Sequence, residues 1–297
     1  MNKSIEFITR LQPEELEWWR STIVKFRREY IKDPKSYAEK IIQEEKITRD
    51  TLKISLEKHL EVIREKVWGL YLIDEAEFHR NVLAHLMLVR DLPRSILQNV
   101  IEEYSLFELD LKNMDREEAY KTIAKLVGDT SGRIFPYLYE LSLSTTQSRR
   151  SRSGKVFERI IETFFEIFEY PYNNQSSIGN AGYDTVGLGK KVDLIVPDVE
   201  KYLDERSKCA VVTMKTSLRE RWQEVAEELQ RTNVPHIYLL TVDKTVTSNT
   251  INVMKRYNIT LVLYKTTKED KLKEFTNVKS FEEFFLHEIP HILSYWK

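Results

Sequence analysis

A lysine at the end of an apolar stretch, followed closely by a charged triplet, is the arrangement in this chain best suited to chemistry. The stretch Val211-Val212-Thr213-Met214 precedes Lys215, and Arg219-Glu220-Arg221 follows within four residues. The β-branched and apolar residues predict a buried strand, and Ser217 is a suitable N-cap for a helix that begins at about residue 218. A strand that ends in this way places an ammonium group at the edge of a sheet, where we expect it to have a partner.

Asp193 is the expected partner. It interrupts the otherwise apolar segment 192–197, which predicts a second strand, and a buried carboxylate is costly unless it is paired or binds a cation. If the two strands are neighbours, Asp193 and Lys215 meet at the edge of the sheet. Nucleases that cut with Mg²⁺ use this pair: the acid ligates the metal ion, and the lysine positions the attacking water or helps to deprotonate it.

A second acid is often found two residues before such a lysine, but Thr213 occupies that position. The helix predicted over about 218–231 offers Glu224, Glu227 and Glu228 as candidates instead. Glu228 lies at the flank of the apolar face of this helix, about 60° from Val225, whereas Glu227 points nearly opposite and Glu224 is intermediate. The geometry therefore favours Glu228 as the acid that turns inward.

The remaining candidates each allow two interpretations. Glu158 lies just outside the apolar arc of a helix predicted at about 153–169, so it is either a site residue or a surface glutamate. Residues 142–155 are polar and basic and predict a loop. The cations of this loop are either solvated or hold phosphates at the helix N-terminus: Arg149, Arg150, Arg152 and Lys155. The triplet after Lys215 is either a solvated first turn or a reader of adjacent G·C pairs.

The order of the elements indicates how these residues are positioned. From Gln12 to about Leu141 nearly every segment has helical period, with helices predicted at about 36–46, 48–66, 74–90, 92–104, 115–127 and 130–142. Strands predicted at 192–197, 210–215, 236–242 and 259–264 then alternate with helices at about 218–231, 248–257 and 280–288. The pattern predicts an α/β fold with a mixed central sheet. It also predicts a helical N-terminal subdomain over 1–141 and a catalytic core over 142–297.

Composition restricts the function only loosely. With 46 Lys and Arg residues against 47 Asp and Glu residues, binding to nucleic acid would depend on a local patch and not on a global field. One cysteine, Cys209, favours a reducing, cytoplasmic setting. No apolar run approaches the ~18 residues of a membrane span, so we expect no membrane association.

Taken together, these residues resemble type II restriction endonucleases of the PD-(D/E)XK class, in the branch of SsoII, PspGI and the EcoRII catalytic domain that cuts CCNGG or CCWGG sites. The resemblance covers about 145–231 and rests on Glu158, Asp193, Lys215 with the triplet and Trp222, and Glu228. In that branch the second acid has moved to the helix after the lysine, which matches Thr213 and Glu228.

The resemblance implies a nuclease core flanked by helices, Mg²⁺ as cofactor and double-stranded DNA as substrate. It implies a homodimer, or a tetramer, with the N-terminal half supplying dimer and DNA contacts. Asp193, Lys215 and Glu228 would form the metal site, and Glu158 would contribute to it. Cleavage would leave 5′-phosphate ends.

The resemblance also implies how the DNA sequence is read. Arg219, Glu220 and Arg221 would read the CC/GG pairs, and Gln147 would contact bases near the centre of the site. Arg64 and Trp68, at i,i+4 spacing on an N-terminal helix, would line a pocket for a flipped central base. The alternative for Trp68 is a place in the core.

Two other functions remain open from the sequence. A repair or junction nuclease with the same metal site would cut according to DNA structure and not to base sequence. A catalytically silent DNA-binding protein would bind without Mg²⁺-dependent cleavage.

Overall fold

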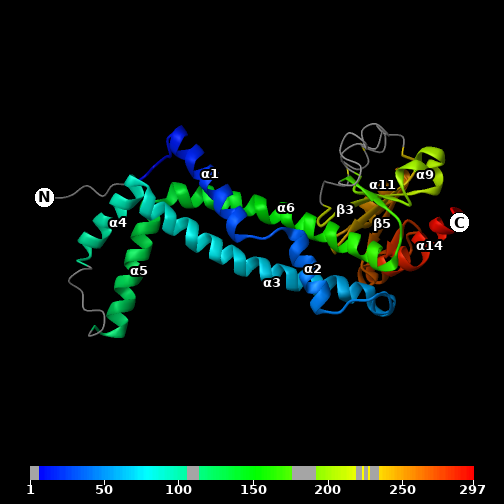
Figure 1. The fold of residues 1–297 in the computed structure, drawn as a ribbon, viewed down its shortest axis with the longest axis horizontal. Coiled ribbons are helices and arrows are strands. Elements are labelled where there is room, and N and C mark those ends of the chain that lie inside the picture. The colour runs from blue at the N-terminus through cyan, green and yellow to red at the C-terminus, as the bar shows by residue number, and fades with distance from the viewer. Residues whose placement is uncertain (1–6, 106–113, 176–191, 219–222, 224–226, 228–233) are drawn as a thin grey trace. The chain divides into compact units, whose positions relative to one another are not determined.

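The computed structural model describes residues 7–105, 114–175, 192–218, 223, 227 and 234–297 (Figure 1). The chain forms two compact units, each made of two stretches of sequence. The helical unit comprises Met1–Asp33 and Gly69–Ser151, and the sheet unit comprises Pro34–Trp68 and Arg152–Lys297. Helices α3 (Arg49–Val89) and α6 (Phe135–Phe168) contribute residues to both. The division expected at residue 142 lies inside α6, and the dimer role assigned to residues 1–141 stays a prediction.

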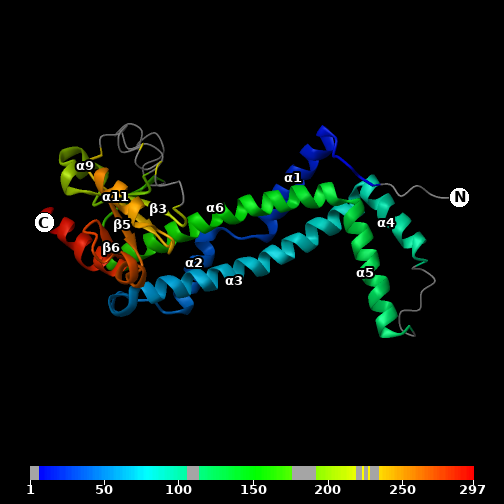
Figure 2. The ribbon, with the colours of Figure 1, turned by 180° about the vertical axis from the view of Figure 1, so that it is seen from behind.

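The sheet unit contains a six-stranded sheet whose spatial order follows the chain from β1 to β6. Its strands are β1 (Asn173–Asn174), β2 (Leu194–Val196), β3 (Ala210–Lys215), β4 (Ile237–Thr241), β5 (Ile259–Leu263) and β6 (Val278–Ser280). The pairs β1–β2 and β2–β3 are antiparallel, whereas β3 to β6 are parallel. Figure 2 shows β5 and β6 side by side. The predicted mixed sheet is therefore confirmed.

Both faces of this sheet are covered, which explains its apolar strands. One face packs on α11 (Ser248–Arg256), whose Ile251 and Met254 share a buried cluster with strand residues. On β4, the ring of Tyr238 packs against Phe284. Besides its parts of α3 and α6, the described residues of the unit form these further helical segments: α2 (Pro34–Glu44), α9 (Val199–Asp204), η1 (Arg206–Lys208), α12 (Lys265–Thr267), η2 (Lys268–Leu272), α13 (Phe281–Glu283), η3 (Phe284–Glu288) and α14 (Ile289–Tyr295).

The helical unit consists of α1 (Pro13–Tyr30), α4 (Asp91–Glu103), α5 (Arg116–Arg133) and its parts of α3 and α6. The indole of Trp19 is fully buried and donates a hydrogen bond to the Tyr137 carbonyl oxygen at 2.9 Å. The helices predicted at 48–66 and 74–90 are one helix, α3, with a non-helical backbone at Ser55. None of the helices within the described ranges is both long and apolar enough to cross a membrane.

The loop predicted at 142–155 is wrong, because these residues lie inside α6. Neighbouring α3 holds them in helical form: Arg149 is ion-paired with Glu75, and the Thr145 hydroxyl lies 2.9 Å from the His79 ring. No proline occurs in the segment. Serine and arginine tolerate a helix when tertiary contacts favour it, so the packing outweighs the loop-like composition.

Candidate active site

Asp193 and Lys215 meet on neighbouring strands. Lys215 is the last residue of β3, and its Nζ lies 3.9 Å from Asp193 Oδ2. Asp193 precedes β2, and its backbone N–H still donates to the Val212 carbonyl oxygen at 2.9 Å, so it continues the ladder between the two strands. Only 18% of the Asp193 side chain and 17% of the Lys215 side chain are exposed. The structure thus brings together the acid and the lysine that the sequence singled out.

Hydrogen bonds fix both charged groups in place. Asp193 Oδ2 accepts from the Met214 backbone N–H at 2.6 Å and from the Thr213 hydroxyl at 3.3 Å. Lys215 Nζ donates to the Met214 carbonyl oxygen at 3.0 Å and to Thr213 Oγ1 at 3.4 Å. The hydroxyl at the position where a second acid is often found therefore contacts both partners. It orients them without adding charge.

Glu158 on α6 belongs to the same electrostatic environment. Burial raises the pKa of Glu158 to about 7, and the negative charge of Asp193 raises it as well, whereas Lys215 lowers it. Burial also raises the pKa of Asp193, against the effects of Lys215 and the Met214 N–H. Two partly buried carboxylates that disfavour each other's ionisation are stabilised by a bound cation.

The described part of this site supplies oxygen donors of the type that Mg²⁺ prefers, from Asp193 and Glu158. Within the described ranges, no group of three or more His, Cys, Asp or Glu residues could hold a metal ion. The third expected ligand, Glu228, lies outside the described residues. So do the expected base readers, Arg219, Glu220 and Arg221. By chemical type and by charge, the two described carboxylates fit a divalent metal ion.

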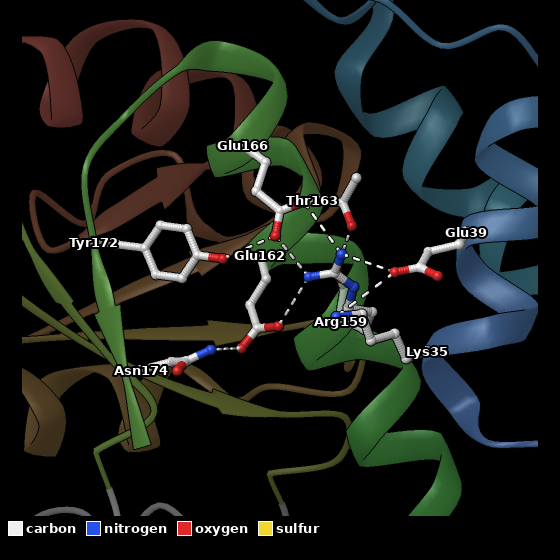
Figure 3. Close-up of polar contacts among 8 residues, drawn as sticks. All are labelled: Lys35, Glu39, Arg159, Glu162, Thr163, Glu166, Tyr172 and Asn174. Atoms are coloured by element: carbon white, nitrogen blue, oxygen red, sulfur yellow. Dashed lines mark hydrogen bonds and ion pairs between the residues drawn. The ribbon is translucent and has the colours of Figure 1, made fainter. Parts of the chain in front are cut away.

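The residue after Glu158, Arg159, binds three carboxylates (Figure 3). Its guanidinium donates to Glu166 at 2.7 Å, to Glu39 of α2 at 3.2 Å and to Glu162 at 3.4 Å. The Arg159 side chain is 12% exposed, while Glu39 and Glu166 are nearly half exposed. This cluster therefore joins α2 to the part of α6 that carries Glu158.

Glu162 extends the Arg159 cluster to the sheet. Its Oε1 accepts from Asn174 Nδ2 at 2.8 Å, and Asn174 of β1 pairs with Leu194, the residue after Asp193. The negative charge of Glu162 raises the pKa of both Glu158 and Asp193. The hydrogen bond from Asn174 on β1 therefore holds the Glu162 carboxylate toward the edge of the sheet that carries Asp193.

The basic residues of α6 are divided between the two units. In the helical unit, Gln147 and Arg150 are exposed, and Arg149 donates from Nε to both carboxylate oxygens of Glu75 at 3.0 Å. In the sheet unit, Arg152 is half-buried and Lys155 is exposed. The positive charge of Lys155 lowers the pKa of Glu158, so this lysine lies within electrostatic reach of the acidic site.

The two residues considered for a flipped-base pocket lie on α3 in the sheet unit. Arg64 Nη1 donates to the Tyr264 hydroxyl at 3.2 Å. Trp68 is 39% exposed, so its ring is not part of the core. The alternative reading of Trp68 as a core residue is therefore wrong, and its role in base binding stays a prediction.

Asp243, beyond the end of β4, was not found from the sequence. Its Oδ2 accepts a hydrogen bond from the Leu218 backbone N–H at 2.8 Å, three residues after Lys215. A sequence signal was available, since a carboxylate directly follows the apolar segment 236–242, and the carboxyl ends of parallel strands share one edge of a sheet. Asn174, in a two-residue strand, carries no such signal.

Comparisons with known proteins identify the family of the chain. A family model described as the EcoRII C terminal matches residues 120–285. The type II restriction enzyme SsoII of Shigella sonnei is 40% identical over 147 residues, which are 50% of this chain and 48% of that enzyme. The match thus spans about half the length of this curated relative.

Solved structures are similar over most of the chain. Metal-depleted Ecl18kI in complex with uncleaved, modified DNA is 27% identical, with a TM-score of 0.75 over 97% of this chain and 87% of that one. Its complex with uncleaved DNA has a TM-score of 0.74 over 95% and 86%, also at 27% identity. A complex of the restriction endonuclease PspGI with substrate DNA is 18% identical, with a TM-score of 0.58 over 89% and 94%, a likeness of fold alone.

Proposed function

The chain belongs to the EcoRII C-terminal family, and from this membership we propose that it is a type II site-specific deoxyribonuclease that cuts double-stranded DNA with Mg²⁺. The observation that carries the proposal is the Lys215 ammonium held 3.9 Å from the Asp193 carboxylate, in the electrostatic field of Glu158. The type II restriction enzyme SsoII, as a relative, and the DNA complexes of Ecl18kI support the same activity and substrate.

Phosphodiester hydrolysis needs a positioned water, charge stabilisation at the phosphate and protonation of the leaving oxygen. Mg²⁺, held by Asp193, Glu158 and Glu228, would supply positive charge to the phosphate when bound. Lys215, fixed by the Met214 carbonyl and Thr213 hydroxyl oxygens, orients the attacking water beside Asp193. Attack in line with the 3′ oxygen would leave 5′-phosphate and 3′-hydroxyl ends.

The proposed recognition sequence is a palindrome of the CCNGG type. Arg219 and Arg221 would donate to guanine O6 and N7, and Glu220 would accept from cytosine N4. Gln147 would contact bases near the centre of the site. Base pairs that flank the CCNGG-type site would be read in addition to it.

The DNA backbone would be bound by cations along α6: Arg149, Arg150, Arg152 and Lys155. Arg149 already neutralises the buried carboxylate of Glu75, so its loss should destabilise the helical unit as well as weaken DNA binding. Arg150 is exposed on the same helix. Its replacement should weaken binding with little effect on folding.

We assign the flipped central base to a pocket formed by Arg64 and Trp68. The exposed indole of Trp68 suits stacking on a base, and Arg64 would bind its edge after leaving the Tyr264 hydroxyl. A fluorescent 2-aminopurine at the centre of the site should change its emission on binding the wild type and not on binding Trp68→Ala. An equal change with both proteins would exclude this pocket.

A palindromic site is most simply read by a two-fold dimer. Exposed apolar side chains recur at helical spacing on α5 and α6 of the helical unit, which suits an interface with a second copy: Tyr120, Ile123, Val127, Phe135, Tyr139 and Leu143. Light scattering in solution should give the mass of a dimer, or of a tetramer built from dimers. A monomer at assay concentration would contradict this assignment.

Digestion of a plasmid of known sequence with Mg²⁺, followed by sequencing of the ends, tests the proposed function. We expect cuts only at CCNGG-type sites. Cuts that follow DNA structure and share no base sequence would select a repair or junction nuclease. DNA binding without cleavage of any duplex would select a catalytically silent DNA-binding protein.

A further inference from the structure

Asp243 connects the segment that leaves β3 to the segment that leaves β4. The two strands are parallel, and Lys215 pairs with Thr241 at their carboxyl ends. Asp243 Oδ2 accepts from the Leu218 backbone N–H at 2.8 Å. Leu218 is buried, with 3% of its surface exposed. The segment between Lys215 and Leu218 is therefore anchored by a carboxylate that follows β4, and the Leu218 side chain is buried in the same apolar cluster as Leu239 of β4.

The Asp243 carboxylate is itself held in one orientation. Its Oδ1 accepts from the Thr245 backbone N–H at 2.8 Å and from the Thr245 hydroxyl at 2.6 Å. Its backbone N–H donates to Thr241 Oγ1 at 3.1 Å. Burial acts to raise the pKa of Asp243, but hydrogen bonds from Thr245, Leu218 and Ser217 lower it overall. A charged acceptor in a fixed position makes a stronger hydrogen bond than a neutral one.

A second carboxylate holds the other side of Lys215, because Asp193 accepts from the Met214 backbone N–H at 2.6 Å. In the sequence, Lys215 thus lies between two backbone amides, and each amide is bound by a carboxylate next to the end of a neighbouring strand, β2 or β4. Arg219, the first proposed base reader, follows Leu218 directly in the sequence. In the sequence, Leu218 thus lies between Lys215 and the proposed base readers, so a change in its anchoring is expected to affect both.

We propose that Asp243 is a positioning residue for the endonuclease reaction: by fixing the junction 215–218, it couples correct base contact to correct placement of Lys215. The inference rests on the proposed function, and it adds a residue that contacts neither the phosphate nor the bases. Misplacement of a catalytic group by about 1 Å can cost about 100-fold in rate. Loss of Asp243 should therefore lower both the cleavage rate and its selectivity.

The chain offers a matched control in Asp198. Its side chain also accepts a backbone N–H, that of Lys201, at 2.8 Å, and caps α9. Asp198 follows β2, whereas Asp193 precedes it, so Asp198 lies beyond the opposite end of this strand from the site. Asp198→Ala removes the same kind of hydrogen bond as Asp243→Ala without touching the junction. If the loss of such a hydrogen bond only destabilised the fold, both variants would lose activity to a similar extent.

The test compares kcat/KM on the cognate duplex with kcat/KM on a duplex altered at one recognised base pair. Asp243→Ala should lose about 10- to 100-fold on the cognate duplex, with a ratio of cognate to altered cleavage that falls about ten-fold. Asp243→Asn keeps an acceptor for the Leu218 N–H and should lose less. Asp198→Ala should keep both values within about two-fold of the wild type. Equal ratios for Asp243→Ala and Asp198→Ala would overturn the proposal.

Amide hydrogen exchange of residues 214–218 in the full chain measures the anchoring without any cleavage. Exchange at Leu218 should be at least about ten-fold faster in Asp243→Ala, because a hydrogen bond to a charged acceptor is lost. It should be unchanged in Asp198→Ala. A wild type that cuts no DNA would overturn the proposed function, whereas unchanged exchange at Leu218 in folded Asp243→Ala and Asp243→Asn would overturn the anchoring itself.

Discussion

Replacement of Arg159 by methionine should destabilise the sheet unit through three carboxylates. Methionine retains much of the apolar stem of arginine but removes the charge. The pairs with Glu39 and Glu166 are nearly half exposed on the acid side, and each should contribute about 0.2–1 kcal/mol. Glu162 is 19% exposed, and a hydrogen bond to such a charged group contributes about 1.5–3 kcal/mol. Together these losses predict a fall of about 2–5 kcal/mol in the free energy of unfolding.

Equilibrium urea unfolding measures this loss, with Arg20→Met as the matched control. Arg20 is ion-paired to Glu140 at 2.9 Å; the Glu140 side chain is 17% exposed, but the Arg20 side chain is 60% exposed, against 12% for Arg159. Solvent screens a pair whose guanidinium is so exposed, and only one carboxylate loses its partner, so replacement of Arg20 should cost less than about 1 kcal/mol. Adding Glu162→Gln to Arg159→Met should restore part of the stability, because an unpaired charge beside Asp193 and Glu158 is removed. A loss for Arg159→Met no larger than that for Arg20→Met would refute this reasoning.

Three further predictions follow from other residues. The Glu57 carboxylate accepts backbone N–H groups at the starts of α12 and α13, so Glu57→Ala should lose about 1.5–3 kcal/mol in thermal unfolding; an unchanged midpoint would contradict this. Burial lowers the pKa of His79 in the folded protein, so the free energy of unfolding should decrease as the pH drops below about 6.5. In urea unfolding across that pH range, His79→Gln should show a smaller decrease than the wild type. Arg219→Ala and Arg221→Ala should each lose about 1–3 kcal/mol of binding free energy for cognate DNA. If the wild type bound the cognate duplex and a duplex altered at one C·G pair equally tightly, the triplet would be excluded as the reader.

The strands of the site could be predicted because the sheet is buried on both faces. Such strands are apolar throughout, so Asp193 and Lys215 stood out as the charged residues at their ends. The distance between them depends on β2 and β3 being neighbours, and the antiparallel pairing meets that condition. Local sequence and expected burial were therefore sufficient to predict that Asp193 and Lys215 meet.

Other parts of the site depend on contacts between distant segments and could not be predicted in this way. The helical state of 142–155 depends on Glu75 and His79 of α3. The direction of Glu162 depends on Asn174, in a strand too short to leave a periodic signal. Such contacts follow from tertiary packing, which local propensity does not encode.

Cleavage of a duplex with one CCNGG-type site by the wild type and by Lys215→Ala tests the central claim most directly. The variant should unfold at the same urea concentration and bind the duplex, but it should cut the duplex about 10²–10⁴-fold more slowly with Mg²⁺. The ammonium beside Asp193 is then required for the chemical step. Cleavage by Lys215→Ala at a rate close to that of the wild type would contradict the account.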